Sequence, residues 1–156
     1  MSQEIEWDSY YGTGNIDQIT LFEKKVGLIF PDSYKNIVSK YNGAYPASKD
    51  SFEFYNKLLK EKMVIDSGMF LPFGKVEKSN ETMNIKWDHK PENFSEELLI
   101  FSALGNGDFL CFDYRKEPNS NRPSIVVFHQ EGNDLSESIS PVSNNFDDFL
   151  DLLFEE

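Results

Sequence analysis

Four residues of the sequence carry the groups that acid–base catalysis or metal binding would need: Asp108, Asp113, His129 and Glu131. His129 and Glu131 stand two positions apart and would share one face of a strand, and imidazole with carboxylates is a common donor set. The chain has only 2 histidines, which is little material for a metal site. We therefore favour structural roles and predict no catalytic site, no metal and no cofactor. A hydrolase built from the four residues is a minor alternative, which requires them to converge on one pocket.

Two other features have a plain structural interpretation. The segment from Gly105 to Asp108 could be read as a phosphate-binding loop, but it joins two predicted strands, whereas the usual phosphate loops lead into a helix N-terminus. We predict a turn. Cys111 shares one side of its strand with Phe109, which favours a small buried hydrophobic residue over a nucleophile.

Charge is distributed unevenly along the chain, whose net charge is -12. Lysine and arginine are absent from Pro123 to Glu156, while many lysines fall between Lys24 and Lys62, so we expect an electrically polarised molecule. Acidic residues kept together either serve solubility or attract a cationic partner. We take the following as candidate partner-binding residues: Glu131, Asp134, Glu137, Asp147, Asp148 and Asp151.

The composition also argues against some partners and locations. An acidic protein is poorly suited to bind nucleic acid directly or to bind an anionic membrane surface. Met1 to Asp8 lacks a basic, apolar leader, and no apolar run approaches the roughly 20 residues that span a bilayer. A single cysteine can form no internal disulfide, which agrees with a reducing compartment. We expect a cytoplasmic protein.

Periodic apolar residues predict three helices. The spacing from Ile16 to Val26 predicts the first helix, with Gly27 as its C-terminal cap. Pro31 opens a second helix, which continues to Tyr41 and closes at Asn42 and Gly43. The third helix ends the chain and has Asn144 as its cap. Its apolar stripe consists of Phe146, Phe149, Leu150 and Leu153. Asp147, Asp148 and Asp151 lie on the opposite side.

The strands are predicted around one hairpin. Leu98 to Phe101 and Phe109 to Tyr114 are apolar runs joined by a glycine-containing connection, which is typical of an antiparallel hairpin. Ser124 to Phe128 predicts another strand, followed by a polar loop from Gln130 to Ser140. One domain covers residues 1–156, because the length suits a single core. The fold class is α+β, with an antiparallel sheet of about four to six strands packed with helices.

The middle of the chain leaves alternatives open. Ser51 to Tyr55 fits a short strand, whereas Tyr55 to Val64 has a lysine-rich helical composition. Phe70 to Phe73 is a short strand or an edge segment, because proline cannot donate to a central ladder. Met83 to Trp87 fits a strand or a helix capped by Ser79, and we favour the helix. Pro91 to Asn93 is a predicted loop.

Several short pieces, in order from Ile16 to Leu153, resemble the SUKH superfamily, which contains the Smi and Knr type fungal cell-wall regulators and many bacterial proteins. The pieces are Phe30 to Tyr34, Tyr41 to Gly43, Leu99 to Phe101 before Gly105 to Phe109, Cys111 to Asp113, Phe128 to Glu131 and Phe146 to Leu150. Ser48 to Lys90 contributes nothing to this match.

The resemblance implies a single α+β domain. For stand-alone bacterial members it implies an immunity protein that binds and blocks a co-produced toxin, often a nuclease. A nuclease toxin is basic where it holds phosphate, so we expect a basic toxin domain as the cognate partner. The alternative is a non-catalytic interaction or scaffold module of the cell-wall-regulator type.

Overall fold

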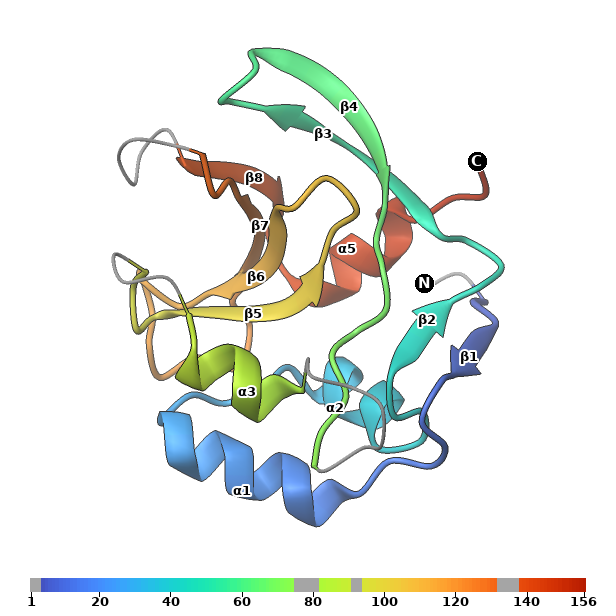
Figure 1. Ribbon diagram of the computed structural model, residues 1–156, viewed down its shortest axis with the longest axis vertical. Helices are drawn as coiled ribbons and strands as arrows, with labels where there is room; N and C mark the ends of the chain where they lie inside the picture. Colours follow the sequence, from blue (N-terminus) through green and yellow to red (C-terminus); the bar gives the residue numbers. More distant parts are fainter. Residues whose placement is uncertain (1–3, 75–81, 91–93, 132–137) are drawn as a thin grey trace.

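A four-stranded antiparallel sheet, in the order β5-β6-β7-β8, lies at the centre of the molecule (Figure 1). The computed structural model describes residues 4–74, 82–90, 94–131 and 138–156. The helices are α1 (Ile16–Val26), α2 (Asp32–Val38), α3 (Met83–Asp88) and α5 (Phe146–Leu152). The strands are β1 (Trp7–Ser9), β2 (Ala44–Pro46), β3 (Ser51–Asn56), β4 (Glu61–Asp66), β5 (Leu98–Ala103), β6 (Phe109–Asp113), β7 (Ser124–Phe128) and β8 (Ile139–Ser143). The α+β class with an antiparallel sheet is confirmed.

The predicted hairpin is confirmed as β5 and β6, and the predicted strand after it as β7. The register of β5 shifts between Ile100 and Ser102. There the Ser102 hydroxyl donates to the Ser67 carbonyl at 2.6 Å, which attaches the segment after β4 to the sheet. The connection from Gly105 to Asp108 is a turn, as expected, with Gly107 at φ 92° and its N–H donating to the Leu104 carbonyl.

Aromatic rings fill the space between the sheet and the helices α2 and α5. The ring of Phe112 on β6 lies 4.2 Å from Phe101 on β5, 5.0 Å from Tyr34 on α2 and 5.8 Å from Phe146 on α5, centroid to centroid. All four side chains are at most 1% exposed. Large rings remove much apolar surface from water, so this cluster fixes both helices on one face of the sheet.

The first two helices are confirmed, and the end of the second needs a correction. α1 begins at the cap Asn15, whose side chain accepts from the Asp17 N–H, and ends at Gly27 with φ 76°. α2 ends at Val38 instead of Tyr41, although Tyr41 still packs against the core. Asn42 is buried, and its amide bonds both the N–H and the carbonyl of Phe73.

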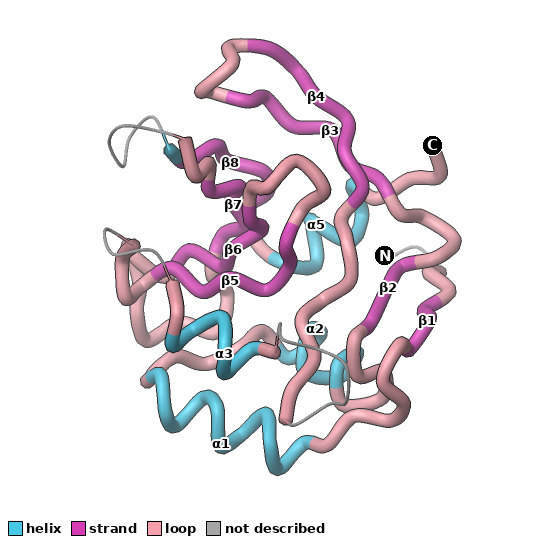
Figure 2. Tube along the Cα trace, viewed as in Figure 1, coloured by secondary structure: helices cyan, strands magenta, loops and turns pink. Residues whose placement is uncertain are grey.

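The helical composition of Tyr55 to Val64 is misleading, because these residues belong to the β3–β4 hairpin (Figure 2). Helix propensity is a weak preference that tertiary contacts override. Met63 and Ile65 pack against the core while Lys62 and Val64 are exposed, which is the alternation of a strand. Lys60 turns the chain at φ 60°, and the Asn56 side chain accepts from the Leu59 N–H.

Sequence patterns did not predict β8 or the pairing of β1 with β2. The last residues of the predicted polar loop pair with β7, with Ser140 opposite Val127. The sequence of β8 carries two serines and a proline, so it lacks the apolar alternation that marked β7. α5 is confirmed, but its cap is Asn145 instead of Asn144.

The remaining open segments are resolved in part. Phe70 forms an isolated bridge with Ser102, and residues 71–74 are not part of a strand. The helix favoured for Met83 to Trp87 is confirmed as α3, capped by the Thr82 side chain. The alternative cap Ser79 and the predicted loop from Pro91 to Asn93 lie outside the described residues. None of the helices in the described ranges is long and apolar enough to cross a bilayer.

Candidate functional site

Three of the predicted partner-binding residues lie together on the outward face of α5. The cap Asn145 accepts from the Asp148 N–H at 2.8 Å, and its amide donates to the Asp148 carboxylate at 3.2 Å. The buried residues Phe146, Phe149 and Leu150 face the core. Because a helix turns about 100° per residue, Asp147, Asp148 and Asp151 are exposed, as predicted.

The local charges favour a stable acidic helix face. Asp147 and Asp148 stand in the first turn of α5, where carboxylates interact favourably with the positive end of the helix dipole. Arg122 forms an ion pair with Asp147 at 3.9 Å, with both side chains more than half exposed. An exposed pair of this kind contributes about 0–1 kcal/mol. The face therefore keeps its negative character without straining the helix.

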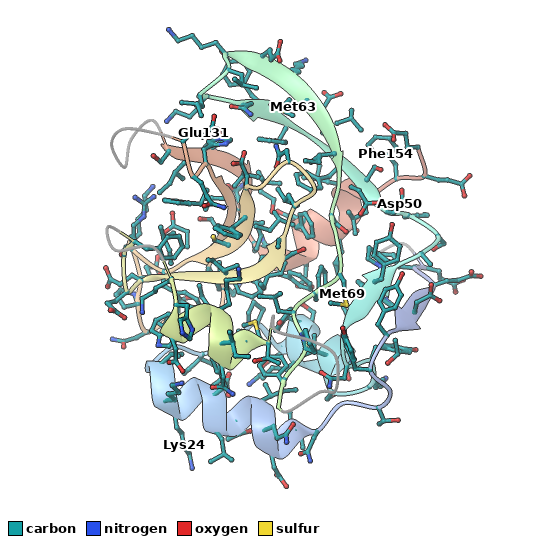
Figure 3. All side chains as sticks on the ribbon, in the orientation of Figure 1. Lys24, Asp50, Met63, Met69, Glu131 and Phe154 are labelled. Atoms are coloured by element: carbon teal, nitrogen blue, oxygen red, sulfur yellow. The ribbon has the colours of Figure 1, made fainter. Side chains whose placement is uncertain are left out.

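Glu131 lies apart from these three residues. Glu131 comes after the last residue of β7. α5 comes after the last residue of β8, and that end of β8 pairs with the first residues of β7. The five residues of β7 separate the two places by roughly 17 Å. In Figure 3 Glu131 lies well away from Phe154, which follows α5. Asp134 and Glu137 lie outside the described residues.

The uneven distribution of charge along the sequence does not divide the folded surface into one acidic side and one basic side. The hairpin β3–β4 carries Lys57, Lys60 and Lys62, all exposed. The backbone N–H of Lys57 donates to the Ser140 hydroxyl at 2.8 Å, so these lysines lie beside β8, a strand of the stretch that lacks lysine and arginine, although Glu53, Glu61 and Asp66 balance their charge within the hairpin. A partner that covers both α5 and the hairpin would meet both signs of charge.

Two of the four candidate catalytic residues do meet, together with a serine that sequence reasoning missed. The His129 Nδ1 lies 2.8 Å from the Asp108 carboxylate, and its Nε2 lies 2.7 Å from the Ser140 hydroxyl. A neutral imidazole with its proton on Nδ1 satisfies every group, because Ser140 then donates to Nε2 and accepts from Lys57. Only strand pairing reveals this contact, since Ser140 lies on the unpredicted β8.

The arrangement of Asp108, His129 and Ser140 is similar to a hydrolase triad, but its histidine and serine are buried away from any substrate. His129 is 1% exposed and Ser140 is 0% exposed, with the Phe54 ring stacked over the imidazole at 6.4 Å. The three side chains connect the hairpin, β8 and the turn before β6. Their geometry therefore gives a buried hydrogen-bonded link between three segments.

Asp113 lies at the opposite end of β6 from Asp108 and interacts with Arg115. The guanidinium of Arg115 donates to both carboxylate oxygens at 2.9 and 2.8 Å, and its backbone N–H donates at 3.0 Å. Burial alone would raise the pKa of the Asp113 carboxyl, but these hydrogen bonds from Arg115 outweigh burial and lower it. Asp113 therefore has the structural role predicted for it, and the four candidates do not converge on one pocket.

Cys111 is fully buried, as predicted for a small hydrophobic residue. Burial, with a smaller contribution from Asp113, raises the pKa of its thiol, which disfavours the reactive thiolate. Among the residues that the structure describes, no group of three or more His, Cys, Asp or Glu side chains could hold a metal ion.

Comparison with known families agrees with this architecture. Residues 14–152 match the SMI1 / KNR4 family (SUKH-1), a region that runs from the turn before α1 to the end of α5. The chain belongs to this family, and the resemblance seen in the sequence is confirmed. No curated protein sequence matches the chain.

Proposed function

We propose that the chain is a non-enzymatic immunity protein that binds and neutralises a cognate, basic toxin domain of a bacterial polymorphic toxin system. Membership of the SMI1 / KNR4 family (SUKH-1) supports this role, because an immunity role is what the resemblance implies for bacterial members. The observation that carries the proposal is the outward face of α5, where Asp147, Asp148 and Asp151 are presented by one helix fixed to the core.

Masking is the mechanism that this surface supports. A nuclease toxin gathers lysine and arginine where it holds phosphate, so a rigid row of carboxylates can occupy the same groove. Charge complementarity of this kind raises association rates by about 10- to 1,000-fold at low salt. Fast capture suits an inhibitor that must act before its target does damage. The toxin binds in the cytoplasm in this proposal, because that is where it would act on nucleic acid.

The proposal needs no chemistry from the His129 cluster. His129 and Ser140 are sealed in the interior, and Asp113 is occupied by Arg115 at the far end of β6. A protein that acts by steric and electrostatic cover requires a stable surface and no reacting group.

Neutralising the α5 face tests the proposal. We expect Asp147→Asn, Asp148→Asn and Asp151→Asn together to slow association with the toxin domain encoded beside this chain's gene by about 10-fold at low salt. Asparagine is preferred to lysine, because a cation in the first turn would oppose the helix dipole and destabilise α5. Surface plasmon resonance across a salt series gives the rate, and growth rescue in co-expressing cells gives neutralisation.

A matched variant controls for net charge. Glu4→Gln, Glu61→Gln and Glu96→Gln remove the same charge from exposed positions on other segments. Association at near wild-type rates is expected for this control. An equal loss in both triple variants would assign the effect to net charge alone, and the absence of any complex or rescue would overturn the proposal.

The family's cell-wall-regulator members favour a second candidate, a non-catalytic scaffold module. Gene neighbourhood separates the two. A neighbouring gene for a large secreted protein with a variable C-terminal domain favours immunity. A captured partner that does not harm cells favours the scaffold.

A further inference from the structure

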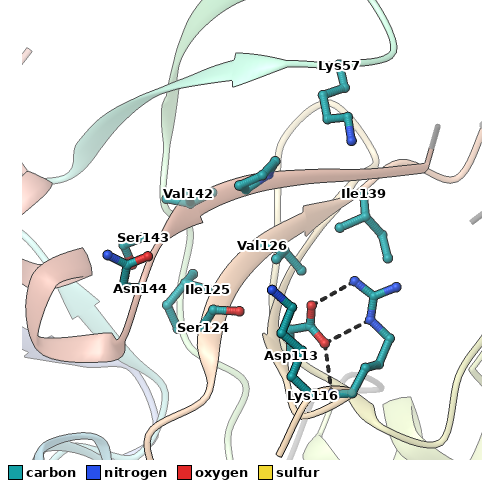
Figure 4. Close-up of a pocket in the computed structure, with 12 residues that line it drawn as sticks. Lys57, Asp113, Lys116, Ser124, Ile125, Val126, Ile139, Val142, Ser143 and Asn144 are labelled. Atoms are coloured by element: carbon teal, nitrogen blue, oxygen red, sulfur yellow. Dashed lines mark hydrogen bonds and ion pairs between the residues drawn. The ribbon is translucent and has the colours of Figure 1, made fainter. Parts of the chain in front are cut away.

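A pocket of about 380 Å³ opens beside the strands β6, β7 and β8 (Figure 4). Strand pairing places Asp113 opposite Ser124 and Val126 opposite Pro141, so these side chains share one face of the sheet. This face is opposite to the one that bears Phe112 and packs against α2 and α5. The pocket volume falls in the range of small-molecule sites, about 300–1,000 Å³.

The rim of this pocket is positively charged in a chain whose net charge is -12. Lys57, Arg115 and Lys116 line it, and Asp113 is the one carboxylate among the lining residues that the structure describes. Arg115 neutralises Asp113 through two hydrogen bonds, so Lys57 and Lys116 remain as an excess of two positive charges.

The two lysines reach the pocket from different segments. Lys57 comes from the β3–β4 hairpin and Lys116 from the segment after β6, on opposite sides of the pocket in Figure 4. Neither ammonium group forms an ion pair with any residue in the described ranges, whereas Lys25, Lys35 and Lys90 each do. Lys116 also helps to lower the pKa of Asp113 from a distance, but neither ammonium group has a carboxylate of the described residues in direct contact, and two such groups at one pocket favour an anion between them.

The floor of the pocket is apolar. Val126, Ile139, Pro141 and Val142 line it, and Ser124 adds a hydroxyl near the charged end. The Ser143 hydroxyl also lies at the rim, but it already donates to the Asn145 carbonyl at 2.8 Å. An apolar floor beside a cationic rim fits a ligand with an anionic group and a short apolar body.

We propose that this pocket binds a small organic anion, whose carboxylate or phosphate lies between Lys57 and Lys116 and whose apolar part rests on Val126 and Ile139. The site is separate from the acidic face of α5, because none of Asp147, Asp148 and Asp151 lines it. Ligand binding here is a second property of the chain, beyond capture of a basic protein.

Titration with matched six-carbon probes tests the proposal. Hexanoate and hexyl phosphate carry the two anionic groups on one apolar body, and inorganic phosphate and hexylammonium lack the body or reverse the charge. We expect hexanoate, hexyl phosphate or both to shift amide NMR signals of β7 and β8 with a dissociation constant of about 1 mM. The preferred probe distinguishes carboxylate from phosphate. Equal binding of hexylammonium, or no saturable binding of either organic anion, would overturn the proposal.

Charge-neutral variants test the rim. Lys57→Gln with Lys116→Gln should weaken binding by about 10-fold or more, since the backbone N–H of Lys57 that holds Ser140 is kept. Lys24→Gln with Lys40→Gln changes net charge equally at exposed positions outside the pocket and should leave affinity within about 2-fold. Equal weakening in both would show binding to net charge alone and contradict the site. The α5 triple variant should bind the probe like the wild type, which keeps this test independent of toxin capture.

Discussion

Tyr34 and Tyr114 are both buried, and they differ in one hydrogen bond. The Tyr114 hydroxyl donates to the Ile29 carbonyl. The Tyr34 hydroxyl has no hydrogen-bond partner in the part of the chain that the structure describes. Burial, with a smaller contribution from Tyr114, raises the pKa of Tyr34, and burial, with a smaller contribution from Glu23, raises that of Tyr114. Both phenols therefore stay neutral even at a pH that ionises a free tyrosine.

We expect Tyr34→Phe to leave the free energy of unfolding unchanged or to raise it by up to about 1 kcal/mol, because it removes a buried polar atom that has no partner. Tyr114→Phe should lower it by about 1–2 kcal/mol, because it leaves the Ile29 carbonyl unpaired. Urea denaturation of the two variants measures the difference. A loss on Tyr34→Phe as large as that on Tyr114→Phe would contradict the assignment of the unpaired hydroxyl.

At the scale of the elements, the side chain of Ser140 fixes the β3–β4 hairpin to the sheet. It links the Lys57 N–H to the His129 ring, which in turn contacts Asp108 before β6. Phe52 and Phe54 of β3 add apolar contacts, because both side chains are buried in the core. The hydrogen bonds of Ser140 therefore fix the segment from which Lys57 reaches the pocket beside β6, β7 and β8.

Ser140→Ala should lower the free energy of unfolding by about 1–3 kcal/mol, because it leaves the buried His129 Nε2 and the part-buried Lys57 N–H without this partner. Hydrogen exchange at the Lys57 amide should accelerate more than exchange in β6, as the hairpin opens locally. Ser143→Ala is the matched control on the same strand, since its hydroxyl bonds the Asn145 carbonyl instead. Equal exchange at Lys57 in both variants would count against the link.

Local patterns were sufficient for the elements that follow one period. α1, the β5–β6 hairpin, β7 and α5 each bury a regular set of side chains, so their spacing identified them. β4 and β8 were missed because their sequences hide the alternation: lysine-rich composition masks β4, whereas β8 buries Ser140 and exposes Pro141.

The candidate site followed the same division. The outward direction of Asp147, Asp148 and Asp151 could be predicted, because the helix period alone sets it. The separation of Glu131, the contact of His129 with Ser140 and the cationic pocket could not, because each depends on the register of β8 against β7 or on the hairpin beside it.

At the scale of the whole molecule, a net charge of -12 on 156 residues destabilises the compact state through self-repulsion. We expect the melting temperature to rise by about 3 °C between low salt and ~0.3 M NaCl, because screening relieves about 1 kcal/mol of repulsion. Differential scanning calorimetry measures the change. The Glu4→Gln, Glu61→Gln and Glu96→Gln variant should show a smaller rise, and a melting temperature that falls with salt would mean that attractive ion pairs dominate instead.

The strand β4 has one neighbour among the described strands, β3, and its other edge is open (Figure 2). An open edge of six residues is a template for unwanted addition of another molecule. Glu61 and Lys62 stand on this strand, and Lys60 stands in the turn before it. Copies that stacked on this edge in parallel register would place Lys62 against Lys62 and Glu61 against Glu61, and this repulsion between like charges disfavours fibrous aggregates.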